Sequence, residues 1–114
     1  MRIMQGWERS DMSDPFYMLP RWRRLRDSVL RRDGYMCREA LRYGKHVPAT
    51  HVHHIFPRET YPEYQWEPWN LIAVSLEAHN AMHDRTTGQL TAVGQGWLER
   101  TARKRGIDTR PGHP

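Results

Sequence analysis

The sequence has 114 residues, of which 38% are hydrophobic, enough for one domain with a modest core. Its formal charge is +5 and 16 of its 18 basic residues are arginines, so a polyanionic partner and a merely solvated surface are about equally expected. No apolar run is long enough to span a membrane or form a secretory signal, and a single cysteine, Cys37, excludes an internal disulfide and a Cys-rich zinc site.

The first predicted element is a basic helix. Pro20 is suited to a first helical position, and Trp22, Leu25 and Val29 follow at helical spacing, while the arginines of RWRRLRDSVLRR fall mainly on other faces. The turn residues Asp33-Gly34 should end this helix. An irregular stretch, residues 35–49, is expected to follow.

Two short strands and a helix are predicted next. THVHHI (50–55) and NLIAVS (70–75) are typical of strands because Thr, Val and Ile favour pleated surfaces, and the Pro-rich, aromatic segment between them suits a long loop. Ser75 can cap a helix through LEAHNAMHD (76–84). A final packing helix should contain Leu90, Val93, Trp97 and Ala102 and end near Gly106.

Five histidines lie in the first predicted strand and in the helix that follows the second. His79 and His83 lie four residues apart, so on a helix they share one face and can bind one metal ion. A strand would direct His53 toward that helix and His54 elsewhere, where it could take a proton from water. Asn70 could fix the loop backbone, orient the ring of His54, or serve as an ordinary turn residue.

These motifs resemble a known family. HVHHI, WNLIAVS and EAHNAMHD, in this order, resemble the His-Asn-His (HNH) endonucleases, as in the nuclease domains of DNase colicins and the HNH proteins of bacteriophages and prophages. The resemblance covers residues 16–85 and implies an α+β fold, with a ββα-metal hairpin-plus-helix core (about 48–85) inside a nuclease domain (16–105) with flanking N-terminal and C-terminal helices. Residues 1–15 would be an N-terminal extension and 106–114 a flexible tail.

The resemblance also implies a role for each motif residue. His53, His79 and His83 match the metal ligands, His54 matches the general base, and Asn70 matches the asparagine that constrains the loop and orients the base. One divalent ion would suffice, and the sequence does not decide between Mg, Mn, Ni and Zn. His51 could be a further ligand, although a bystander is the preferred interpretation, and His46 and His113 receive no role.

The chain departs from many phage relatives in one respect. Their two Cys-x-x-Cys pairs hold a structural zinc, whereas the matching positions here are Cys37 with Ala40 and Ser75 with Ala78. We therefore expect no structural zinc held by four cysteines, with Cys37 as a small core residue. Apolar packing should replace the zinc, and the residues expected to supply it are Trp22, Tyr35, Trp66 and Trp69.

The leading functional prediction is a metal-dependent endonuclease that nicks or cuts DNA. Arg21, Arg23, Arg24 and Arg85 are the candidate contacts to the DNA backbone. Terminase or other packaging proteins of a phage are partners implied only by resemblance, and the expected setting is soluble and cytoplasmic. The alternative is a non-catalytic nucleic-acid-binding module stabilised by zinc, with His51 as a fourth ligand. A basic domain with no metal is the third possibility.

Overall fold

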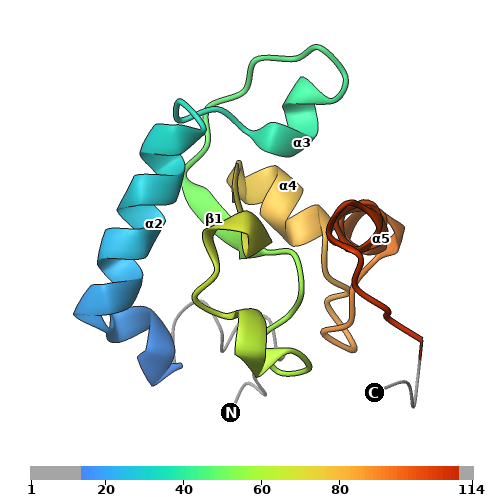
Figure 1. Cartoon of the computed structure of the whole chain (residues 1–114). Coiled ribbons are helices and arrows are strands. Elements are labelled where there is room, and N and C mark those ends of the chain that lie inside the picture. The colour runs from blue at the N-terminus through green and yellow to red at the C-terminus, as the bar shows by residue number, and fades with distance from the viewer. Residues whose placement is uncertain (1–13, 111–114) are drawn as a thin grey trace.

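The computed structural model describes residues 14–110, which form a two-stranded antiparallel sheet covered by helices (Figure 1). Residues 1–13 and 111–114 lie outside the described residues, and with them most of the predicted N-terminal extension, the end of the predicted tail and His113. The predicted α+β class with a hairpin-plus-helix core is confirmed. Among the described residues no helix is both long and apolar enough to cross a membrane.

The elements follow the predicted order, with short helical turns in the segments expected to be irregular. Pro20 opens the basic helix as predicted, and Gly106, with φ 69°, ends the last one. In chain order they are η1 (Pro15–Met18), α2 (Pro20–Arg32), α3 (Arg38–Leu41), β1 (His51–His54), η2 (Pro62–Tyr64), η3 (Pro68–Asn70), β2 (Leu71–Val74), α4 (Leu76–Ala81) and α5 (Ala92–Arg105).

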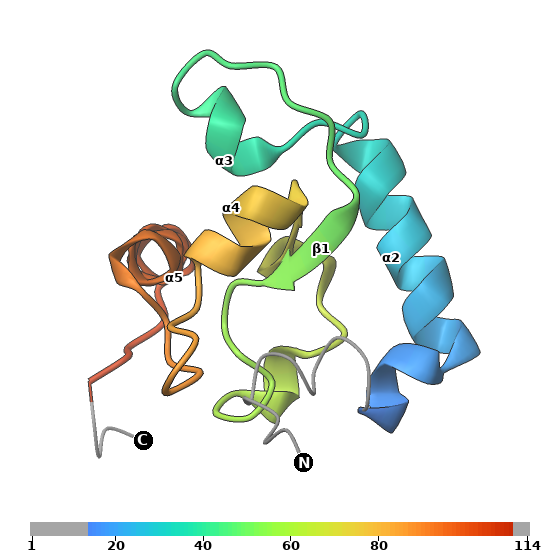
Figure 2. The ribbon, with the colours of Figure 1, turned by 180° about the vertical axis from the view of Figure 1, so that it is seen from behind.

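The hairpin sends alternate side chains to two different helical layers. His53 lies opposite Ile72 and His54 lies opposite Leu71 in the antiparallel register. Because successive residues of a strand face opposite sides, the first pair points to the layer of α4 and α5, and the second pair points to α2. Figure 2 shows β1 between α2 and α4.

The α2 layer is packed on the hairpin and also bonded to it. Trp22 and Val29 of α2 share a buried cluster with Leu71 of β2. Beyond the end of α2, the Asp33 carboxylate accepts a hydrogen bond from the Ala73 N–H at 3.0 Å. Arg32 Nη2 donates to the Leu71 carbonyl at 2.6 Å. Side chains at the end of α2 thus form hydrogen bonds with backbone groups of β2.

The opposite layer contains the larger core. Side chains of β2 and α5 pack together there, and α5 approaches very closely at Gly94, where an added Cβ would lie 2.5 Å from the Met82 carbonyl oxygen. Only glycine permits this approach. The buried cluster comprises Cys37, Ile55, Phe56, Ile72, Val74, Met82, Trp97, Leu98 and Ala102.

Candidate functional site

Three histidines meet between β1 and the segment that contains α4. His53 comes from β1, His79 from α4, and His83 from just beyond it, and one ring nitrogen of each lies within 4.8 Å of the others. His53 is 1% exposed and His79 is 7% exposed, whereas His83 is half-buried. The structure therefore brings together the three histidines that the sequence motif singled out.

The route by which His83 reaches this group differs from the prediction. We expected His79 and His83 on one helix through residue 84, but α4 ends at Ala81 with Met82 as its C-cap. His83 instead pairs with Leu90 in an isolated β-bridge. The intervening turn is closed by the Asp84 carboxylate, which accepts from the N–H groups of the two residues that follow Arg85 at 2.7 and 2.9 Å. A carboxylate that bonds nearby backbone N–H groups favours a turn over continued helix.

The surroundings of His53 are those expected for a metal ligand. Both of its ring nitrogens are buried, and neither has a hydrogen-bond partner among residues 14–110. A buried polar atom without a partner is costly, so such a ring is suited to a bound cation. Burial, together with the charges of His83 and His79, lowers the pKa of His53 well below its usual value. A neutral imidazole is the form that binds metal.

His79 also has a lowered pKa. Burial lowers the pKa of His79 to about 4, and the nearby His51 adds to the shift. His79 and His53 thus remain neutral near neutral pH and offer lone pairs in one place. Three imidazoles form an incomplete coordination shell, which leaves positions for water or an oxygen ligand. The donor set fits a borderline divalent ion such as Zn, Ni, Co or Mn.

His54 lies on the other face of the strand, in an aromatic cradle. Its ring stacks on Trp22 with centroids 5.1 Å apart and an angle of 21°. Its Nε2 donates to the Gln65 carbonyl at 3.1 Å, because a carbonyl can only accept, which leaves the lone pair on Nδ1. The hydroxyl of Tyr17 lies 3.5 Å from that Nδ1. Burial lowers the pKa of His54 to about 4, against the effect of the Gln65 hydrogen bond.

Asn70 holds the loop that contains Gln65, whose carbonyl bonds His54. Its Oδ1 accepts from the Phe56 N–H at 2.7 Å, and its Nδ2 donates to the carbonyls of Phe56 and Tyr64, both at 3.1 Å. Tyr64 immediately precedes Gln65, whose carbonyl bonds His54. Of the interpretations left open by the sequence, the structure favours bonding of the loop backbone. Asn70 is fully buried, and its hydrogen bonds reach the loop backbone rather than the His54 ring.

His51 stands beside the group but outside it. Its ring stacks on His79 with centroids 5.7 Å apart, and its Nδ1 lies 2.8 Å from the Thr50 hydroxyl oxygen. The group of described residues whose ligand atoms converge within 4.8 Å contains His53, His79 and His83 but not this residue. The preferred interpretation of His51 as a non-ligand agrees with this geometry.

A pocket beside β1 gathers part of the basic helix. It has a volume of about 240 Å³ and is lined by Arg23 and Arg26 of α2 together with Tyr17 and His51. Arg26 and Tyr17 were not singled out by the sequence, although Arg26 follows Arg23 by three residues and so shares its helix face. Of the other candidate contacts, Arg21 lies over the Trp66 ring at 4.1 Å.

The two remaining candidate contacts, Arg24 and Arg85, are exposed. Neither lines the pocket beside β1. Arg24 projects from α2, and Arg85 lies two residues beyond His83.

Three of the four positions that the resemblance matched to cysteines lie in or against one apolar cluster. Cys37 is 1% exposed, and Ala40 and Ala78 pack against the same core cluster. The residues expected to fill this region were largely wrong: Trp22 and Trp66 belong to the α2 layer, and Tyr35 is 54% exposed. Trp69 does pack here, and Trp97 supplies much of the remaining bulk.

The structure is similar to the crystal structure of the HNH endonuclease of the deep-sea thermophilic bacteriophage GVE2 with a manganese ion. The TM-score is 0.58 and the sequences are 30% identical, over 65% of this chain and 80% of the phage chain. No family model matches the sequence, and no curated protein matches it.

Proposed function

Because the chain belongs to the HNH endonuclease family, of the bacteriophage type, we propose that it is a metal-dependent endonuclease that hydrolyses DNA phosphodiester bonds. The observation that carries the proposal is a pair of adjacent strand residues with different surroundings. His53 joins a largely buried group of three imidazoles, while His54 bonds Gln65 through Nε2 and keeps a lone pair on Nδ1, near the Tyr17 hydroxyl, to accept a proton. A binding module has no need of the second arrangement.

His53, His79 and His83 would hold the divalent ion. When bound, the ion would act as a Lewis acid that stabilises negative charge on the phosphate and on the leaving oxygen. Nδ1 of His54 would take a proton from a water molecule, whose oxygen then bonds to phosphorus as the bond to the 3′ oxygen breaks. The product would carry a 5′ phosphate. Asn70 is a positioning residue in this scheme.

DNA would reach the site along β1. Arg23 and Arg26 line the pocket that contains His51, so their guanidinium groups can meet phosphates next to the histidine group. Arg21, Arg24 and Arg85 are proposed as outer backbone contacts. Such contacts position the duplex without reading its sequence, so we propose weak sequence preference.

The alternative proposal, a zinc-stabilised binding module, requires a closed set of four protein ligands. The convergent group of described residues contains three histidines, and His51 lies outside it. This geometry favours a site with open positions, as catalysis needs. The fixed orientation of His54 also has no function in a purely structural site.

Cleavage of supercoiled plasmid with Mn, Mg, Ni or Zn tests the proposal and reports nicking and double-strand cutting together. His54→Ala should reduce the cleavage rate by about 10²–10⁴-fold, the usual contribution of a general base, and leave metal affinity unchanged. His46→Ala is the matched control, because His46 is an exposed histidine outside the motif. Equal cleavage by His54→Ala and the unmodified protein would refute the catalytic assignment.

A further inference from the structure

A second basic pocket lies at the outer edge of β2. It has a volume of about 290 Å³, and none of its lining residues belongs to β1 or α4, which contribute His53 and His79. Leu71 and Ile72 of β2 line it, together with residues of η3, the end of α2, the start of α3 and the end of α5. The pocket is therefore distinct from the candidate metal group and from the pocket beside β1.

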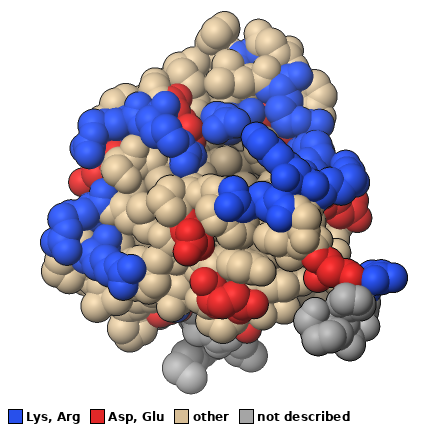
Figure 3. Space-filling model, in the orientation of Figure 1, with Lys and Arg blue, Asp and Glu red and all other residues tan. Residues whose placement is uncertain are grey.

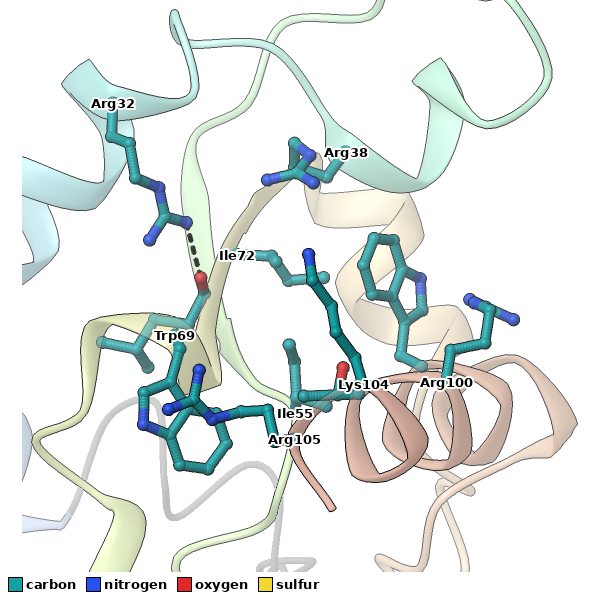
Figure 4. A pocket seen from close by; sticks show the side chains of 11 residues that line it. Arg32, Arg38, Ile55, Trp69, Ile72, Arg100, Lys104 and Arg105 are labelled. Carbon is teal, nitrogen blue, oxygen red and sulfur yellow. Dashed lines mark hydrogen bonds between the residues drawn. The ribbon is translucent and has the colours of Figure 1, made fainter. Parts of the chain in front are cut away.

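Five cationic side chains line this pocket, and none of its lining residues is acidic. Figure 4 shows Arg32, Arg38 and Lys104 pointing from different elements toward a common space in front of β2. In Figure 3 basic side chains gather on both sides of the upper part of the same face. The cationic residues are Arg32, Arg38, Arg100, Lys104 and Arg105.

The nearby acidic groups do not neutralise this charge. Asp33 is shared by Arg32 at 2.8 Å and Arg38 at 3.2 Å, so one carboxylate serves two guanidinium groups. Lys104 and Arg105 form no ion pair with any residue of the described segment 14–110. Their positive charge remains available to a ligand.

Arg100 lines the pocket from α5, but its guanidinium points away from the space that Arg32, Arg38 and Lys104 share (Figure 4). Its Nη2 is buried and has no hydrogen-bond partner among the described residues. Burial, with the charge of Arg42 adding, lowers the pKa of Arg100. Arg100 therefore adds positive charge beside the pocket without facing the common space.

Two aromatic rings give the basic groups a fixed position. The Arg105 guanidinium lies over the Trp69 ring at 4.2 Å, and that of Arg100 lies over Trp97 at 5.1 Å. Stacked guanidinium groups retain in-plane N–H donors, which match pairs of phosphate oxygens. The pocket volume is near the lower limit for ligand pockets, about 300 Å³. The pocket is therefore larger than a single small anion would fill.

We propose that this pocket binds the phosphodiester backbone of DNA on a face of the domain other than the cleavage face. Four of its five cations are arginines, the residue best matched to phosphate. The domain would then contact two DNA segments, or two parts of one bent segment. The inference goes beyond the proposed cleavage and can be tested without it.

The test measures binding of a short duplex DNA by fluorescence anisotropy, with the full chain, in EDTA so that no metal contributes. Lys104→Gln with Arg105→Gln removes two exposed cations of the pocket. Lys45→Gln with Arg103→Gln removes the same two residue types, both exposed, from outside it. Each variant is titrated between about 50 and 200 mM salt, where counterion release makes phosphate contacts visible.

Loss of two phosphate contacts should reduce the magnitude of the slope of log affinity against log salt concentration by about 2. Between the lowest and highest salt, the affinity of the pocket variant should therefore fall by a factor about ten times smaller than that of the control variant. At the lowest salt the pocket variant should bind about tenfold more weakly than the control variant. Equal slopes for the two variants would overturn the proposal. So would a pocket variant that loses affinity for inorganic phosphate or polyglutamate while its DNA affinity matches the control. Failed plasmid cleavage with an intact difference in salt slope would refute only the catalytic proposal.

Discussion

The two faces of the hairpin place adjacent histidines in opposite situations. His53, toward α4, is buried with neither nitrogen bonded to any described residue, whereas His54, toward α2, has Nε2 bonded to Gln65 and its ring stacked on Trp22. His53, as a candidate metal ligand, has no hydrogen-bond partner for either ring nitrogen among the described residues. His54, as a candidate base, is held through Nε2, and this leaves the lone pair on Nδ1. One step along a strand is enough to separate the two roles.

The largest effect is expected from a variant on the face of the hairpin toward α4. Zinc sites with four ligands bind with about 10–16 kcal/mol, so His53→Ala should weaken metal binding by about 4 kcal/mol, or about a thousandfold. His51→Ala is the matched control, since it removes an imidazole from the same strand face but outside the group. Calorimetric titration with Mn or Zn measures both. Equal losses would mean that His51 is also a ligand.

The next test acts on the α2 face through Asn70. Asn70→Ala leaves the bonded groups of Phe56 and Tyr64 without their buried partner, which should lower the free energy of unfolding by about 3 kcal/mol. Cleavage should fall as the Gln65 carbonyl shifts from His54, while metal affinity should persist. Urea unfolding and plasmid cleavage provide the measurements.

Asn80→Ala is the control for that variant. Asn80 Oδ1 has no hydrogen-bond partner within residues 14–110, so the change should cost less than about 1 kcal/mol. If both asparagine variants lost the same stability, the three bonds of Asn70 would not be what holds the loop.

A third test compares two glycines of α5. A Cβ at Gly94 would lie 2.5 Å from the Met82 carbonyl oxygen, next to His83, so Gly94→Ala should destabilise the fold by about 2 kcal/mol and weaken metal binding. The three atoms nearest to a Cβ at Gly96 all belong to the end of the Arg100 side chain, the first at 3.0 Å, and none is a backbone atom. Gly96→Ala should be neutral or stabilise by up to about 1 kcal/mol, because alanine favours helix. Denaturant midpoints that shift equally would contradict the close approach.

The smallest expected effect concerns the attachment of α2 to β2. Burial alone would raise the pKa of Asp33, but hydrogen bonds from Arg32 and the Ala73 N–H, and the charges of Arg32 and Arg38, lower this pKa below its usual value. A lowered folded-state pKa contributes stability above the unfolded value, and this is lost as the pH falls through the folded pKa. Asp33→Asn should therefore cost about 1 kcal/mol at neutral pH and flatten the decline below about pH 4. Parallel acid-unfolding curves would contradict this.

The sequence predicted the elements that local chemistry determines. Pro20 and Asp33-Gly34 marked the limits of α2, and Ser75 caps α4 by accepting from the Ala78 N–H at 3.1 Å. Strand alternation separated His53 from His54 correctly, since their burial partners lie in different layers. These signals lie within a few residues of the features they predict.

Long-range contacts were harder to predict. The end of α4 depends on the Asp84 turn and on the bridge between His83 and Leu90, which helical spacing does not reveal. The acceptor for His54 is the backbone carbonyl of Gln65, a group that every residue has. Tyr17 lies 37 positions before His54 and meets it only because η1 folds back on the hairpin. No local pattern encodes such pairs.

The three bonds of Asn70 also separate the loop into a fixed base and an exposed tip. Its hydrogen bonds reach Phe56 and Tyr64, so backbone geometry near His54 is fixed without help from Glu59 or Thr60, which are exposed. The tip is thus a natural insertion point, where a targeting peptide or a whole recognition domain could be grafted without altering hairpin register. Residues 59–60 are therefore the first position at which to test such an insertion.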